Sequence, residues 1–107
     1  MIPFQFQDFM EFVLNKTRAG TLKWMPGEGY SYIANHKDIS LYISSDFDPE
    51  REISSFWFRL HGSHGTTPFS VFDNEQDYNF MKIIFEEVIA NANNVKGDME
   101  SFMADFD

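Results

Sequence analysis

Apolar residues recur at helical spacing near both ends of the chain. Gly20 follows the first such segment, at the place where a left-handed cap usually ends a helix. Asp73 and Gln76 precede the second segment with the spacing of a capping box. The pattern predicts one helix over 4–19 and another that follows the Asp73 cap and carries its apolar stripe from Tyr78 to Ala92. The apolar stripes comprise Phe6, Phe9, Met10, Val13 and Leu14 in the first, and Tyr78, Met81, Ile84, Phe85, Val88, Ile89 and Ala92 in the second.

Between these segments, apolar and polar residues tend to alternate with the period of two that is typical of half-buried strands. Short polar turns separate the runs, and parallel strands would need much longer crossover connections. The pattern therefore predicts an antiparallel meander. Its five expected strands are 21–25, 30–33, 39–44, 53–61 and 67–72.

The order of elements predicts a single α+β domain over residues 1–107, with both helices packed on the same face of a five-stranded antiparallel sheet. Residues 93–107 form an acidic tail in which Met99, Phe102, Met103 and Phe106 again have helical spacing. We expect this tail to be a short amphipathic helix that either docks on the domain or stays mobile.

The period of two also predicts which side chains point away from the helices. If Ile39, Leu41, Ile43, Phe56, Phe58, Leu60, Phe69 and Val71 face the helices, then Tyr42, Trp57, Arg59 and Phe72 face the other way. Tyr, Trp and Arg often dominate the energy of protein interfaces. The pattern therefore predicts a partner-binding surface on the second face of the sheet, unless the tail or a second copy of the chain covers it.

Composition adds a preference for basic partners. Aromatic residues make up 18% of the sequence, and the formal net charge is −9. Residues 73–107 contain nine acidic residues and two lysines, a net charge of −7. This charge disfavours nucleic acid and anionic membranes and favours a protein with a basic surface. Candidate acidic contacts are Asp46, Asp48 and Glu50 in one loop, and Asp73, Glu75 and Asp77 before the second helix.

Residue patterns that carry catalysis or bind metals are weak in this chain. It contains no cysteine, and a calcium loop counted from Asp46 would need glycine and glutamate where Arg51 and Trp57 stand. His61 and His64 lie in a Gly-rich turn and lack the glutamate of a zinc helix. We expect no enzyme activity, no metal and no cofactor, while a minor enzyme or small-ligand protein using these two histidines stays an alternative.

Residues 14–24 have the pattern Leu-x-Lys-Thr-x-x-Gly-x-Leu-x-Trp. This segment resembles the helix-to-strand opening of small uncharacterised bacterial and phage proteins. The resemblance implies an α+β fold and a bacterial or phage setting, and it implies no catalytic residues.

The leading hypothesis from the sequence is a small acidic protein-binding domain, an inhibitor or immunity-type protein that masks a basic surface of its partner. The main alternative is a structural or self-associating protein whose aromatic face forms a homodimer. The absence of cysteine, of a basic leader and of a long apolar segment leads us to expect a cytoplasmic protein.

Overall fold

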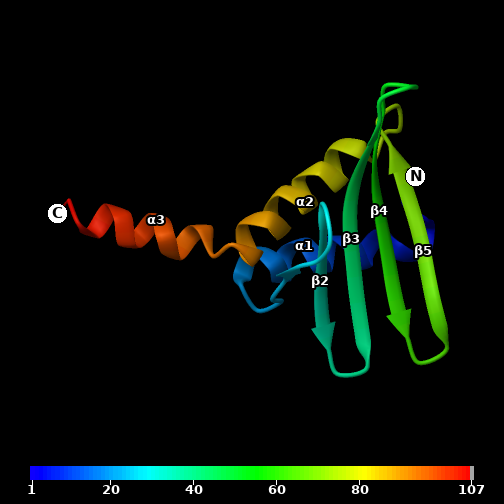
Figure 1. The fold of residues 1–107 in the computed structure, drawn as a ribbon. Coiled ribbons are helices and arrows are strands. Elements are labelled where there is room, and N and C mark those ends of the chain that lie inside the picture. The colour runs from blue at the N-terminus through cyan, green and yellow to red at the C-terminus, as the bar shows by residue number, and fades with distance from the viewer. Residues whose placement is uncertain (107) are drawn as a thin grey trace.

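The computed structural model describes residues 1–106 and has the predicted α+β architecture (Figure 1). An N-terminal helix is followed by a five-stranded antiparallel meander and two further helices. The elements are η1 (Phe4–Phe6), α1 (Gln7–Ala19), β1 (Met25–Pro26), β2 (Ser31–His36), β3 (Ile39–Asp48), β4 (Ile53–Gly62), β5 (Gly65–Phe72), α2 (Tyr78–Ala92) and α3 (Val95–Ala104).

The sheet has the strand order β1-β2-β3-β4-β5, and all its neighbours are antiparallel. Both edge strands carry a proline: Pro26 in the two-residue strand β1 and Pro68 in β5. Proline has no N–H to offer to a neighbouring strand, so it discourages further pairing at an edge. The sheet is therefore better suited to binding through a face than through an edge.

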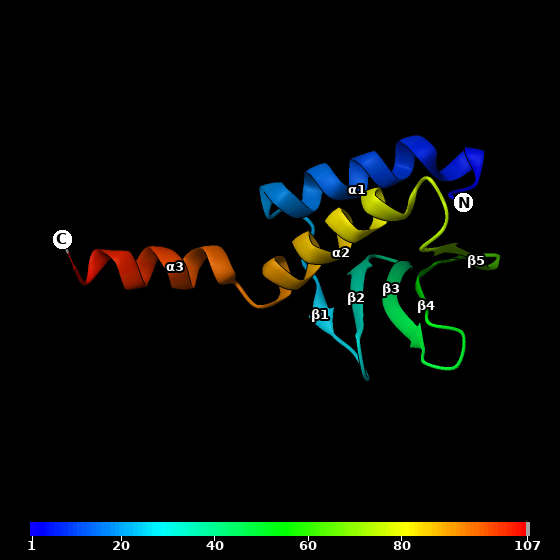
Figure 2. The ribbon, with the colours of Figure 1, turned by 90° about the horizontal axis from the view of Figure 1, so that it is seen from above.

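Helices α1 and α2 cover the same face of the sheet, as the sequence predicted (Figure 2). The core lies between these helices and the sheet, because each element turns its apolar residues towards that layer. Gly20 ends α1 in the left-handed region with φ +77°, as expected for a C-terminal cap. The largest fully buried side chains are Ile2, Met10, Val13, Ile43, Phe58, Val71, Met81, Ile84 and Val88.

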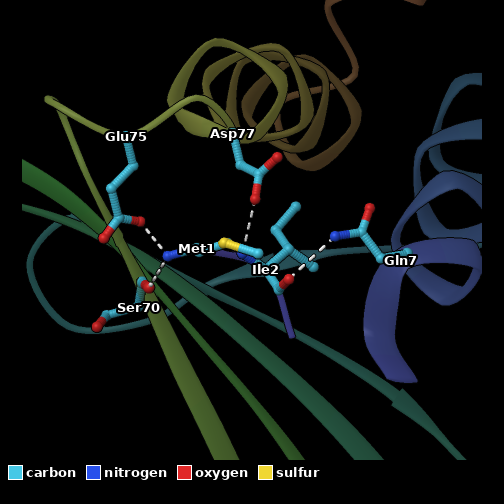
Figure 3. Close-up of polar contacts among 6 residues, drawn as sticks. All are labelled: Met1, Ile2, Gln7, Ser70, Glu75 and Asp77. Atoms are coloured by element: carbon cyan, nitrogen blue, oxygen red, sulfur yellow. Dashed lines mark hydrogen bonds and ion pairs between the residues drawn. The ribbon is translucent and has the colours of Figure 1, made fainter. Parts of the chain in front are cut away.

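The first two residues are anchored beside the start of α2 (Figure 3). The Ile2 amide donates a hydrogen bond to Asp77 Oδ2 at 2.8 Å, and Gln7 Nε2 donates to the Ile2 carbonyl at 3.0 Å. The Met1 amino group pairs with Glu75 Oε2 and lies 3.3 Å from the Ser70 carbonyl oxygen. These contacts join the N-terminal segment to β5 and to the β5–α2 connection.

Four details differ from the sequence-based expectation. Strand β3 continues to Asp48, so Asp46 and Asp48, which were expected in a loop, belong to the strand. The strand expected over 21–25 begins only at Met25, because Trp24 is buried and makes hydrogen bonds to the helices. The predicted capping box is wrong: α2 starts at Tyr78, and the Asp73 carboxylate instead accepts the Ser54 amide at 2.9 Å. Ile39 belongs to the helix-facing side of β3 but is 46% exposed.

Helix α3 extends away from the rest of the domain (Figures 1 and 2). It contains Met99, Phe102 and Met103 of the predicted apolar stripe, whereas Phe106 follows its end, and none of its residues is buried. Asn94 precedes it in the left-handed conformation, with φ +52°. The C-terminal segment is therefore helical within the described residues and does not cover the second face of the sheet; Asp107, at the end of the predicted tail, lies outside them.

Candidate functional site

The sheet face opposite α1 and α2, here called the open face, carries a mixed row of side chains across all five strands. Strand pairing places Tyr42 opposite Arg59, and the row ends in Met25 on one side and Pro68 on the other. The sequence predicted the Tyr42 and Arg59 positions because β3 and β4 alternate clearly. Met25, Ile33 and Pro68 were missed, because only the strand register shows that they belong to the same row.

Two aromatic contacts organise the centre of the open face. The Arg59 guanidinium carbon lies 4.7 Å from the centre of the Tyr42 ring, a cation–π arrangement. The rings of Trp57 and Phe72 meet edge to face with centroids 6.2 Å apart. Trp57 is 44% exposed and Phe72 is 36% exposed, so both rings present apolar surface to solvent.

The Trp57 side chain is held by its own strand. Its indole Nε1 donates a hydrogen bond to Ser55 Oγ at 2.9 Å, and Ser55 is buried. An aromatic side chain held in this way loses little conformational freedom when a partner binds. Trp57 is therefore a suitable anchor residue for an interface.

A hollow of about 400 Å³ lies in the open face beside these side chains. Its walls include the Tyr42 and Trp57 rings, the Arg59 side chain, and the side chains of Ser31 and Ser44. Apolar walls with a few polar groups are typical of sites that accept one side chain of a partner. Further serine and threonine residues surround the aromatic band, so the face is more polar than the sequence suggested: Ser40, Thr66 and Ser70.

The acidic residues predicted to bind a partner fall into two groups. Asp46 and Glu50 are exposed, and Asp46 shares a cross-strand row with Phe72 at one end of the open face. Asp48 shapes the loop, because its Oδ1 accepts the Glu50 amide at 3.0 Å. Asp46 is therefore an acidic side chain of β3 at the end of the open face, and Glu50 is an exposed acid in the loop that follows β3.

The second acidic group has intramolecular partners. Asp73 binds the Ser54 amide, Glu75 binds the Met1 amino group, and Asp77 binds the Ile2 amide. The contacts of Glu75 and Asp77 tie the β5–α2 connection to the N-terminal segment (Figure 3), and the Asp73 contact ties the end of β5 to β4. The structure gives these three carboxylates a structural role, and their contribution to a partner interface stays a prediction.

His61 and His64 lie at the β4–β5 hairpin. His61 Nδ1 is 2.7 Å from Thr66 Oγ1, its cross-strand neighbour, and both residues are exposed. Within residues 1–106, no group of three or more His, Asp or Glu side chains is arranged to hold a metal ion. The hairpin therefore shows a single local hydrogen bond and no assembled ligand set.

A partly buried polar cluster that the sequence pattern did not predict joins α1, α2 and the segment between α1 and β1. Asn91 Oδ1 accepts the Trp24 amide at 2.9 Å, and its Nδ2 donates to the carbonyls of Thr17 at 3.0 Å and Leu22 at 2.8 Å. Trp24 Nε1 also donates to Thr17 Oγ1 at 3.0 Å. The available signal was a polar residue in the apolar stripe of α2, three positions after Val88.

This cluster gives the Leu-x-Lys-Thr-x-x-Gly-x-Leu-x-Trp pattern of residues 14–24 a structural explanation. Thr17 supplies the hydroxyl acceptor, Gly20 permits the left-handed turn, and Trp24 fills the space beside the helices. All three act in the core rather than on the open face. The pattern is therefore a folding element in this chain.

None of the helices formed by residues 1–106 combines the length and apolarity needed to cross a bilayer. Comparisons of the chain with protein-family models, with curated proteins and with solved structures yield no match, so its candidate site is defined by its own geometry.

Proposed function

We propose that this chain is a small protein-binding domain that uses the open face of its sheet to mask a basic surface of a partner protein. The observation that carries the proposal is the band formed by Tyr42, Arg59, Trp57 and Phe72 on a face that neither α1 nor α2 covers. Aromatic and arginine side chains of this kind supply most of the energy of many interfaces.

The hollow beside Trp57 and the acidic loop have different roles in this proposal. The hollow accepts an apolar or aromatic side chain of the partner, because Tyr42, Trp57 and Pro68 are among the residues that line it. Asp46 and Glu50 at the end of the face favour basic residues around that anchor. The net charge of −9 attracts the same class of partner over longer distances.

Affinity capture from a native-host lysate tests the aromatic part. We expect the wild-type chain to retain a protein partner that a Tyr42→Ala/Trp57→Ala variant retains at least about 30-fold more weakly, as for loss of a binding hot spot of about 2 kcal/mol. Phe4→Ala is the matched control, because Phe4 is 92% exposed and lies on η1. Equal retention by the double variant would contradict the proposal.

Charge reversal tests the electrostatic part. Asp46→Lys/Glu50→Lys is expected to slow association with the captured partner by at least about tenfold at low salt, with a smaller effect at high salt. Glu11→Lys/Glu86→Lys makes the same change in net charge at exposed positions of α1 and α2. Equal effects of the two variants on the association rate would show that net charge alone matters and would refute a local role of the loop.

A further inference from the structure

Helix α3 has an apolar stripe without a partner in the described chain. Met99, Phe102, Met103 and Phe106 follow helical spacing and are between 54% and 76% exposed. Isolated helices as short as α3 are marginal in water, and most helices are stabilised by packing an apolar face. We therefore expect the apolar stripe to pack against a surface that lies outside the isolated chain.

An apolar groove lies elsewhere on the same molecule, between α1 and the β2–β3 hairpin. Its volume is about 300 Å³. Phe9 and Phe12 line one side, Ile39 and Leu41 line the other, and Lys16 and His36 add polar groups. The surface it presents is mainly apolar, and Phe12 and Ile39 are both exposed. We call it the Lys16 groove.

Charge makes the stripe and the Lys16 groove complementary. Helix α3 carries Asp98 and Glu100 against a single lysine, Lys96, and Asp105 follows its last residue. The groove is lined by a basic residue, Lys16, whose Nζ lies 5.5 Å from the centre of the Phe12 ring. An acidic helix with an apolar stripe fits such a surface better than it fits another copy of itself.

The second apolar groove of the molecule is less suitable. It lies between the ends of β3 and β4 and helix α2, with a volume of about 500 Å³, and includes Phe47 and Tyr78. Asp46 and Glu86 line it together with Lys82. Strand register assigns the Asp46 side chain to the open face, so Glu86 and Lys82 are the charged side chains on this side of the sheet and they offset each other. The described residues that line the Lys16 groove include a lysine and no acid, so charge favours the Lys16 groove for an acidic helix.

The connection between α2 and α3 favours an occupant from another copy. The Asn94 side chain packs against Gly97: a Cβ atom added at Gly97 would lie 2.6 Å from Asn94 Nδ2. This contact accompanies the outward direction of α3, away from the domain (Figure 2). A helix that points outwards can reach a neighbouring molecule without rearrangement of its own connection.

We propose that two copies of this chain exchange their α3 helices, each placing the apolar stripe in the Lys16 groove of the other. The two contacts are equivalent, so the exchange forms a closed symmetric dimer rather than a filament. The contact uses residues outside the open face, so this proposal can be tested independently of the proposed function.

Light scattering over a wide concentration range tests the exchange. We expect the wild-type chain to have the mass of two copies, and Met99→Ser/Phe102→Ser to have the mass of one. Lys16→Glu is expected to raise the dimer dissociation constant at least tenfold, because it places an acid against an acidic helix. Phe72→Ser, on the open face, is the matched control and should remain dimeric. A monomeric wild type, or dissociation caused by Phe72→Ser but not by the α3 variant, would overturn the proposal.

Disulfide trapping tests which surfaces meet, because the natural chain contains no cysteine. Mixed Phe12→Cys and Met103→Cys chains are expected to form a crosslinked heterodimer under mild oxidation. Crosslinking only between two Met103→Cys chains would show pairing of α3 helices and overturn the proposal. A monomeric Phe12→Cys/Met103→Cys chain with an internal disulfide would overturn it as well, because α3 would then occupy its own groove. Circular dichroism melting of each variant ensures that the comparison is between folded chains.

Discussion

Replacing Phe58 with alanine is expected to lower the free energy of unfolding by about 3–5 kcal/mol. Phe58 is 1% exposed, and its ring lies within 6.5 Å, centroid to centroid, of the rings of Phe6, Phe9 and Phe69. These residues come from η1, α1 and β5, so one side chain on β4 holds three other elements together. Its removal leaves a cavity where the helices meet the sheet.

Urea unfolding followed by tryptophan fluorescence measures this loss, since Trp24 is buried and reports on the same core. Phe4→Ala is the control: Phe4 is 92% exposed, so we expect a change within about 0.5 kcal/mol. A Phe58→Ala variant that lost less than about 1 kcal/mol would contradict the packing described for the helix-covered face.

Replacing Asn91 with aspartate is expected to lower the free energy of unfolding by about 2–4 kcal/mol, although the two side chains have nearly the same shape. The carboxylate keeps an acceptor for the Trp24 amide but loses both donors. It also places a negatively charged oxygen against the carbonyls of Thr17 and Leu22, where the amide nitrogen lies at 3.0 and 2.8 Å. The connection between α1 and β1 should therefore loosen.

Asn93→Asp provides the comparison, because it makes the same chemical change at an exposed position near the end of α2. We expect this control to differ little from the wild type. Urea denaturation and the tryptophan emission wavelength, recorded in a Trp57→Phe background so that Trp24 alone emits, are the two readouts. Equal stability of Asn91→Asp and Asn93→Asp would show that the Asn91 hydrogen bonds do not support the fold.

The sequence predicted the open face well where strand alternation is regular. In β3 and β4, Leu41, Ile43 and Phe58 are buried while Trp57 and Arg59 are exposed, because a period of two assigns each side chain to one face. Ile39 follows the same alternation but lies near the β2–β3 hairpin, where it lines the Lys16 groove. Alternation therefore predicts which face of the sheet a side chain is on. It does not predict how far the helices extend over that face.

Local patterns failed where a distant segment supplied the hydrogen bonds. Residues 22–24 alternate like a strand, but Asn91, which is 67 positions from Trp24, binds their backbone and draws Trp24 into the core. Asp73 resembles a helix cap, but its carboxylate accepts a hydrogen bond from the amide of Ser54 on the neighbouring strand. A tertiary partner overrides a local preference in both cases, and such partners are not visible in a single sequence.

The direction of α3 relative to the domain could not be predicted from the sequence for a related reason. The spacing of Met99, Phe102 and Phe106 predicted an amphipathic helix, and the structure has this helix over Val95–Ala104. Whether it docks depends on Asn94, whose left-handed backbone and contact with Gly97 accompany the outward direction of the helix. Neither residue is unusual enough in the sequence to predict that direction.

The central claim is that the open face of the sheet binds the partner. Chemical-shift mapping by NMR with the purified captured protein tests it most directly. The account predicts that the largest perturbations fall on Tyr42, Arg59, Phe72 and the indole N–H of Trp57, while the amides of α1 and α2 change little. Perturbations confined to the helices, with unchanged signals from these four residues, would contradict it.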